Sequence, residues 1–120
     1  MKKSFGQNFL KEQAVINKII KSAKINANSI VYEVGAGDGA LSREIIKVNP
    51  KKYLAIEIDS SLIPKLKTLF TKEHHKLINN DALKFNEQSF FTNDVIIISN
   101  LPYNISIKLL LKWINQHTTK

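Results

Sequence analysis

The chain has 120 residues, enough for one domain, and its 43% hydrophobic content is ordinary for a globular protein and argues against disorder. It contains no cysteine and no apolar run as long as a membrane span, so we expect no disulfide framework, no thiolate metal site, no membrane partner and no signal peptide, with the cytoplasm as its location. Eighteen basic residues against ten acidic ones give a net charge of +8, which is typical of a partner of RNA or DNA but equally of a lysine-rich surface kept for solubility.

The first predicted element is an amphipathic helix over residues 13–24. Its apolar residues recur at the i, i+3, i+4 and i+7 spacing of a helix face, and they are Ile16, Ile19, Ile20 and Ala23. The preceding stretch, residues 5–10, has no clean period and places polar amides between aromatics. We therefore predict that the helix begins only after it.

Strands and helices then alternate along the rest of the chain. Asp59 and Ser60 are the expected N-caps of the second of the three later helices, which tolerates Pro64 only within its first turn. Four consecutive β-branched residues make the fourth strand the clearest one, and we expect it to be buried on both faces. The predicted strands are 30–34, 53–58, 76–79 and 94–99, and the predicted later helices are 41–48, 59–70 and 107–114. This order predicts an α/β fold, a mostly parallel sheet with flanking helices.

Three glycines follow the first strand at alternate positions, in Glu33-Val34-Gly35-Ala36-Gly37-Asp38-Gly39. A strand that enters a helix through such a turn is typical of a nucleotide-type cofactor site. Glycine accepts a positive φ there and lets the backbone approach a ligand. With Ala40, the same turn also satisfies the pattern of a nicotinamide-binding module, and a plain glycine-rich loop is a third interpretation.

Acidic residues follow the next two predicted strands, where an open parallel sheet binds its ligand. Glu57 lies 22 residues after Gly35, close to the spacing of an acid that binds ribose hydroxyls, although a helix-capping or surface acid is the alternative. Asp81 can accept from the amine of an adenine while the Ala82 N–H donates to a ring nitrogen, or Asp81 can simply form a turn. With Glu33, Asp38 and Asp59, five of the ten acids gather at this edge, which leaves the outer surface more basic than the total suggests.

The most specific signal is Asn100-Leu101-Pro102-Tyr103, directly after the fourth strand. Packing alone does not explain this combination. Proline fixes the turn, and the Asn100 side chain with a neighbouring main-chain carbonyl can accept both hydrogens of a planar amine. Tyr103 can stack on a base.

With these residues in view, the chain resembles the rRNA adenine-N6 dimethyltransferases, more their housekeeping (KsgA-type) branch than the macrolide-resistance (Erm) branch. The resemblance runs from Phe5 to about Trp113 in unbroken motif order. It rests on Gly6-Gln7-Asn8-Phe9-Leu10, the turn from Glu33 to Gly39, Glu57-Ile58-Asp59, Asp81-Ala82-Leu83 and Asn100-Leu101-Pro102-Tyr103-Asn104-Ile105-Ser106. It implies a Rossmann-like methyltransferase fold, S-adenosylmethionine as cofactor, and a flipped-out adenine of small-subunit ribosomal RNA as substrate.

The resemblance also implies roles for individual positions. The catalytic set, facing the target base, would be Asn100, Leu101, Pro102 and Tyr103. The cofactor-binding set would be Gln7, Asn8 and Leu10 at the methionine end, Glu33, Gly35 and Gly37 at the turn, Glu57 and Ile58 at the ribose, Asp81 and Ala82 at the adenine, and Asn100. No metal takes part. Ala36 departs from the family, which often has proline there.

Length is the larger departure, because the family's catalytic domain continues with further strands and then a small helical RNA-binding domain. We therefore expect residues 1–120 to form one partial domain, which carries the cofactor half of the site and the first part of the base pocket, and to be a monomer. The fourth strand would be left as an unpaired apolar edge. A non-catalytic RNA- or DNA-binding scaffold with the same fold is the remaining alternative. The three histidines, His74, His75 and His117, are predicted to be surface or loop residues.

Overall fold

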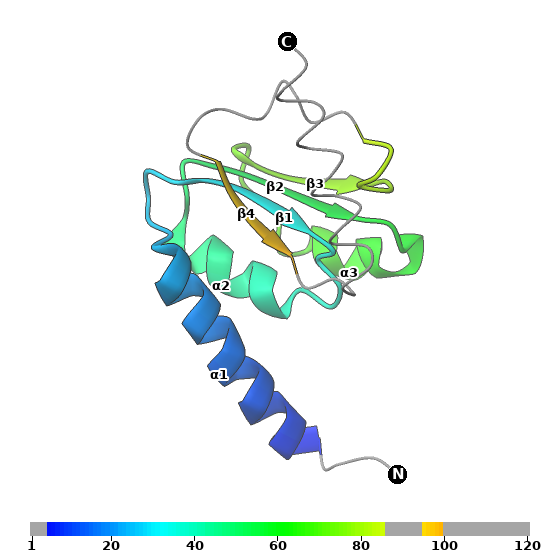
Figure 1. Ribbon diagram of the computed structural model, residues 1–120. Helices are drawn as coiled ribbons and strands as arrows, with labels where there is room; N and C mark the ends of the chain where they lie inside the picture. The colour runs from blue at the N-terminus through cyan, green and yellow to red at the C-terminus, as the bar shows by residue number, and fades with distance from the viewer. Residues whose placement is uncertain (1–4, 86–94, 100–120) are drawn as a thin grey trace.

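The computed structural model describes residues 5–85 and 95–99, with side chains from residue 13 onward. Helices and strands alternate along the chain in the predicted order (Figure 1). The elements are α1 (Phe5–Ala23), β1 (Ile30–Val34), α2 (Ala40–Val48), β2 (Lys52–Glu57), the 3₁₀ turn η1 (Ser60–Leu62), α3 (Ile63–Lys67), β3 (His75–Asn79) and β4 (Val95–Ser99).

The four described strands form one parallel sheet in the order β3-β2-β1-β4. At their carboxyl ends Val34 pairs with Ile56 on one side and with Ser99 on the other, and Glu57 pairs with Asn79. All four strands therefore end at the same edge of the sheet, which confirms the predicted parallel α/β architecture and brings the turns that follow the strands together.

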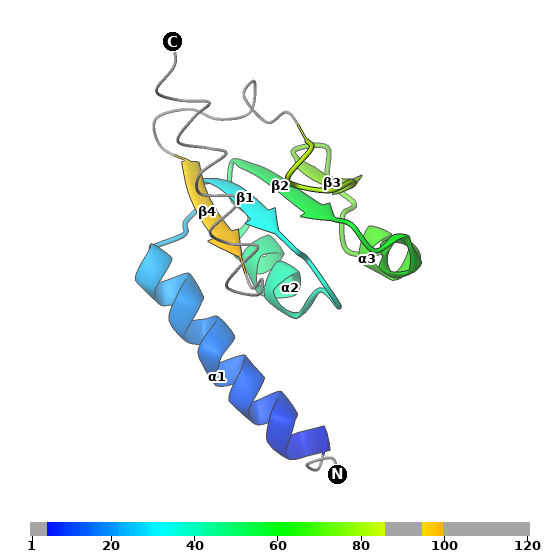
Figure 2. The same cartoon turned by 45° about the vertical axis from the view of Figure 1, so that its right-hand side comes forward.

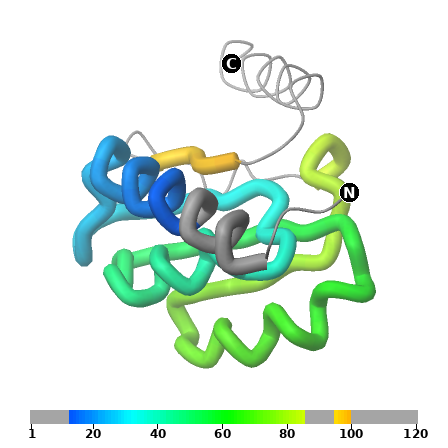
Figure 3. Tube along the Cα trace, turned by 90° about the horizontal axis from the view of Figure 1, so that it is seen from below, coloured from blue at the N-terminus to red at the C-terminus, as the bar shows by residue number. Residues whose placement is uncertain are grey.

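The three helices pack on one face of the sheet. Ile16 of α1, Ile45 of α2 and Leu66 of α3 belong to one buried cluster with Val31, Tyr53, Ala55 and Ile98 of the strands. In Figure 3 the blue turns of α1 lie beside the teal turns of α2, and Figure 2 shows the two helices on the same side of the strands. A second cluster, Tyr32, Val34, Leu54 and Ile56 with Ala82, occupies the other face. The alternation of strand side chains thus divides the apolar residues of β1 and β2 between two cores.

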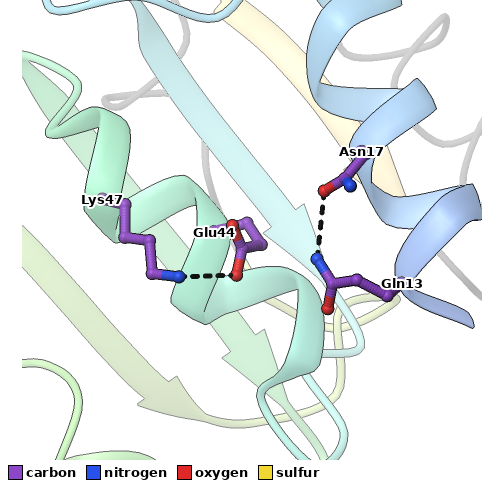
Figure 4. A network of polar contacts seen from close by, with 4 residues as sticks. All are labelled: Gln13, Asn17, Glu44 and Lys47. Carbon is purple, nitrogen blue, oxygen red and sulfur yellow. Dashed lines mark hydrogen bonds and ion pairs between the residues drawn. The ribbon is translucent and has the colours of Figure 1, made fainter. Parts of the chain in front are cut away.

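Helix α1 is longer than the pattern predicts, because it begins at Phe5 and includes residues 5–10. Phe5 and Phe9 stand four residues apart, a helical spacing that two intervening amides obscure. The predicted apolar face is confirmed further along: Ile16 is buried, and Ile19, Ile20 and Ala23 pack against the core. Two polar contacts run along these helices: Gln13 donates to Asn17 within α1 at 3.0 Å, and Lys47 donates to Glu44 within α2 at 3.1 Å (Figure 4).

The predicted helix over 59–70 is wrong in its length. Asp59 caps η1, Pro64 lies in the first turn of α3 as required, but α3 ends at Lys67. Beyond it the chain continues with tighter i to i−3 bonds, since the Thr68, Leu69 and Phe70 N–H groups donate to Lys65, Leu66 and Lys67 carbonyls. The Thr68 hydroxyl also donates to the Lys65 carbonyl at 2.7 Å, which competes with a regular helical bond.

Two burial expectations are also wrong. Strand β4 is not buried on both faces: Ile98 is buried on the helix side, but Ile97 is 39% exposed on the other, where no described helix lies. His75 is not a surface residue but the buried first residue of β3, with its Nε2 at 3.2 Å from the Pro50 carbonyl oxygen. The predicted helix over 107–114 and His117 lie outside the described residues. Within the described chain, no helix is both long and apolar enough to cross a bilayer.

Candidate functional site

The glycine-rich turn leaves β1 and enters α2 with its backbone tied to the next strand. The Gly35 N–H donates to the Ile56 carbonyl at 2.9 Å. Gly35, Gly37 and Gly39 all have positive φ, at 81°, 60° and 86°, which confirms the predicted use of glycine. Gly37 and Gly39 serve different purposes.

Gly37 faces open space. A Cβ added there would meet nothing nearer than the Gly35 carbonyl oxygen, at 3.9 Å. The space above the Gly37 backbone is therefore clear for a ligand. This open space is what the predicted close approach of a ligand would require.

Gly39 instead makes room for the fold. A Cβ added there would lie 2.8 Å from Leu69 Cδ1 and 3.1 Å from Leu66 Cδ2. The start of α2 thus lies directly against the turn that follows α3. This third glycine is a packing residue.

Glu57 ends β2 and joins the two neighbouring turns through its carboxylate. Its Oε1 accepts from the Gly37 N–H at 2.7 Å, and its Oε2 accepts from the Asp59 N–H at 3.0 Å. The side chain is only 6% exposed. A carboxylate has about four acceptor positions, so each oxygen keeps one for a further donor. The arrangement suits a vicinal diol presented from the open side of Gly37.

Asp59 and Asp81, the acids that follow β2 and β3, accept hydrogen bonds from nearby residues of their own turns. Asp59 accepts from the Ser61 N–H at 2.9 Å and from its hydroxyl, and these bonds lower the pKa of Asp59. It is a cap, as predicted. Asp81 Oδ1 accepts from the Leu83 N–H at 2.9 Å, so Asp81 forms the turn that was its alternative interpretation. Its neighbour Ala82 is buried.

Hydrogen bonds join the start of the turn after β2 to the start of the turn after β3. The Asn80 N–H donates to the Glu57 carbonyl at 3.1 Å, and Asn79 Nδ2 donates to the same carbonyl at 2.9 Å. Ile58, the residue after Glu57, is 65% exposed. The structure therefore brings Gly37, Glu57, Ile58 and Asp81 to one edge of the sheet.

Glu33 is a buried carboxylate beneath the turn. Its Oε1 accepts from the Ser42 hydroxyl at 2.7 Å and from the Tyr53 hydroxyl. Burial raises the pKa of Glu33, the two hydroxyl donors act in the opposite direction, and the charge of Glu57 raises the pKa further. Sequence reasoning predicts Glu33 as a cofactor-binding residue and does not identify its partners Ser42 and Tyr53. These two residues carry no motif and reach Glu33 only through the fold.

A cavity of about 170 Å³ lies between α1 and the turn. Val15, Ile16 and Ile19 line it from α1, opposite Glu33, Gly35 and Gly37. This volume is below the range of pockets that enclose a whole drug-sized ligand. It has room for only one end of an elongated ligand. The donors, acceptors and open space at this edge are those that a nucleoside-type cofactor needs.

The remaining predicted site residues are not described in side-chain detail. Gln7, Asn8 and Leu10 lie in α1, but their side chains are outside the described part. Asn100, Leu101, Pro102 and Tyr103 lie outside the described residues altogether. The last described residue of β4, Ser99, pairs with Val34 next to Gly35, so the strand that precedes Asn100 ends at the same edge as the glycine-rich turn.

Comparison with known proteins adds independent information. A family model described as "Ribosomal RNA adenine dimethylase" matches residues 1–120. The chain is 43% identical over 116 residues to "Ribosomal RNA small subunit methyltransferase A" of Wolbachia pipientis (strain wPip), covering 95% of this chain and 44% of that one. It is 41% identical over 122 residues to the Bacillus cereus protein of the same name, covering 96% and 41%.

Solved structures agree with the fold. The crystal structure of a dimethyladenosine transferase from Plasmodium falciparum superposes with a TM-score of 0.71 at 30% identity, covering 88% of this chain and 38% of that one. The chain thus spans less than half the length of these three relatives.

Proposed function

The chain belongs to the ribosomal RNA adenine dimethylase family, and from this premise we propose that it takes part in the transfer of methyl groups from S-adenosylmethionine to the N6 amine of adenine in small-subunit ribosomal RNA. The family is one of S-adenosylmethionine-dependent methyltransferases. The relatives over 40% identical to this chain are named small-subunit enzymes, which supports that subunit as the substrate.

The observation that carries the proposal is the position of the Glu57 carboxylate. It accepts hydrogen bonds from the Gly37 N–H, at 2.7 Å, and from the Asp59 N–H, and so it joins the glycine-rich turn to the turn after β2. It lies beside Gly37, where the backbone faces open space. Glu57 would accept the two ribose hydroxyls with its remaining lone pairs. Asp81, through its second oxygen, and the backbone of Ala82 would bind the adenine of the cofactor.

When bound, S-adenosylmethionine supplies a methyl group on a positively charged sulfur. The chain's part of the work is then positioning. We propose that Asn100 and the Leu101 carbonyl accept the two hydrogens of the target amine, so that its nitrogen lone pair points toward the methyl group, and that Tyr103 stacks on the flipped base. Pro102 would fix the turn that holds them.

We propose that residues 1–120 form the cofactor half of the site and the first part of the base pocket. They would do so as one partial catalytic domain that acts as a monomer in the cytoplasm. The strands and the helical RNA-binding domain that we expect from the family complete the enzyme in its longer members.

Calorimetric titration of this chain with S-adenosylmethionine tests the proposal, with NAD as the competing dinucleotide. We expect saturable binding of S-adenosylmethionine alone, weakened at least tenfold in Glu57→Ala. Glu44→Ala is the matched control, because it removes a carboxylate whose partner is the exposed Lys47 on the outer side of α2. Binding of NAD in its place, or of neither by a chain whose circular dichroism shows it to be folded, would contradict the proposal.

A further inference from the structure

Charge is divided between the two edges of the sheet. The carboxyl edge holds the acidic residues Glu33, Asp38, Glu57, Asp59 and Asp81 of the turns described above. At the opposite edge, where β2 and β3 begin, lies a groove of about 500 Å³. Lys51, Lys52 and Lys76 line it together with His74 and a single acid, Glu73, and we refer to it as the lysine groove.

The strand register places two of these lysines side by side. Leu54 pairs with Lys76 in the parallel ladder, and Lys52 lies two residues before Leu54 on the same face of β2. The strand spacing and the rise per residue put the Lys52 and Lys76 backbones about 8 Å apart. Lys51 directly precedes β2 and lines the same groove. The groove thus gathers three lysines where β2 and β3 begin.

These ammonium groups are not neutralised by the fold. In the part of the chain that the structure describes, the one ion pair joins Lys47 to Glu44 on α2 (Figure 4). Lys51, Lys52 and Lys76 are exposed and take part in no described ion pair or hydrogen bond through their side chains. The groove therefore offers three lysines against one glutamate to a ligand from outside.

The backbone around the groove indicates which kind of anion it can bind. A site for a single phosphate usually adds free backbone N–H groups that converge on it. Here the Lys52 N–H donates to the Ser29 carbonyl at 3.3 Å, and the Tyr53 N–H donates to the His74 carbonyl at 3.1 Å. These donors are used within the fold. A cluster of lysines without such a nest suits an extended chain of negative charges.

We propose that the lysine groove binds the phosphodiester backbone of an RNA segment other than the one that enters the carboxyl edge. The identity of the polyanion rests on the proposed function. The strands are five or six residues long, so the two edges lie roughly 17 Å apart. The acids of the carboxyl edge disfavour a polyanion there. Attraction at the far edge offsets that repulsion and holds the RNA while one adenine is presented to the site.

The test compares two triple variants of equal charge. Lys51→Ala/Lys52→Ala/Lys76→Ala removes the groove lysines, and Lys18→Ala/Lys67→Ala/Lys84→Ala removes three exposed lysines from α1, α3 and the turn after β3. The probe is a fluorescently labelled RNA hairpin with an adenine-containing loop, and its anisotropy gives Kd between 50 and 200 mM KCl. Circular dichroism verifies that both variants are folded, since exposed lysines contribute little to stability.

We expect the groove variant to bind roughly ten- to a hundred-fold more weakly near 0.1 M salt, and its plot of log Kd against log salt to be shallower by about two, from about 0.7 per lost phosphate contact. Lys51→Arg/Lys52→Arg/Lys76→Arg should restore binding. Equal losses of affinity and slope in the two alanine variants would overturn the proposal, as would unchanged binding in both, the result expected if the groove serves an acidic protein.

Titration of the same variants with S-adenosylmethionine separates the two proposals. The groove lies at the far edge from Glu57, so its loss should leave cofactor binding unchanged. Failure of every protein to bind S-adenosylmethionine, with the difference in RNA affinity preserved, would contradict the proposed function and leave the lysine groove supported as an RNA site.

Discussion

Replacement of Tyr53 by phenylalanine isolates one hydrogen bond beneath the cofactor turn. Tyr53 and Glu33 are each 1% exposed, and the Tyr53 hydroxyl donates to the Glu33 carboxylate together with Ser42. Phenylalanine keeps the ring and its contact with Phe70, whose centroid lies 5.3 Å away. The substitution therefore removes a donor from a buried carboxylate with little change in packing.

The expected cost follows from the charge of the acceptor. A hydrogen bond to a charged group contributes about 1.5–3 kcal/mol, against about 1 kcal/mol for a neutral pair. We expect Tyr53→Phe to lower the free energy of unfolding by about 2 kcal/mol where Glu33 is ionised. With a urea m-value of about 2 kcal/mol/M, this moves the midpoint by roughly 1 M.

The effect should depend on pH in a defined direction. Burial raises the pKa of Glu33 above its ordinary value of 4.5, so the folded chain binds more protons than the unfolded chain between these two pKa values. The contribution of Glu33 to stability is thus complete below pH 4.5 and is lost as pH rises through the folded pKa. Tyr53→Phe removes a donor that lowers this pKa, and the loss should extend to higher pH.

Urea unfolding in a pH series from about pH 4 to about pH 9 measures both effects. The destabilisation by Tyr53→Phe should grow as pH rises through the folded pKa of Glu33, and in a Glu33→Gln background it should be small and independent of pH. A cost below about 0.5 kcal/mol throughout the series, or one that does not change between the two backgrounds, would refute the reasoning that Tyr53 stabilises an ionised Glu33.

The remaining predictions concern the turn and His75. Gly39→Ala should lower the free energy of unfolding by about 1–3 kcal/mol, because it combines a positive φ of 86° with contacts of 2.8 and 3.1 Å to leucine side chains, and chemical denaturation measures this cost. Gly37→Ala has open space around its Cβ, so it should lower the free energy of unfolding by only about 1–2 kcal/mol for its φ of 60°. It should nevertheless weaken the binding of S-adenosylmethionine at least tenfold in a calorimetric titration. Unchanged affinity would contradict a ligand above Gly37. Burial lowers the pKa of His75 from 6.5, so its contribution is complete above pH 6.5 and is lost as pH falls through the lowered value; His75→Gln should remove this part of the acid destabilisation in a pH series of thermal midpoints.

The sequence predicts the parallel sheet well because each strand end carries its own local signal. The limits of β1 are those predicted, since an apolar run meets a glycine-rich turn there. Glu57 is predicted as a site residue from its spacing after Gly35. The structure shows that its carboxylate accepts a hydrogen bond from the Gly37 N–H, so this spacing also joins β2 to the glycine-rich turn. Asp59 is identified as a cap because capping is a property of neighbouring residues.

Features that depend on strand register could not be predicted in the same way. Glu33 pairs with Ala55, two residues after Tyr53 and on the same face of the sheet, so the Tyr53 hydroxyl reaches Glu33 only once β1 and β2 are aligned. Burial of His75 likewise requires its pairing with Tyr53 on β2. The partial exposure of β4 depends on which elements cover each face, and an apolar run alone does not contain that information.

The pairing of β1 also has a consequence for how the domain folds. Ile30 is matched with Lys52 on one side and with Val95 on the other, so the second partner is 65 residues away along the chain. Closing so long a loop costs more conformational entropy than closing the shorter β1–β2 and β2–β3 crossovers. During synthesis the first three strands can associate before β4 has emerged. Of the four described strands, the one that leads to the proposed catalytic residues then docks last, beside a glycine-rich turn and a Glu57 carboxylate that are already in place.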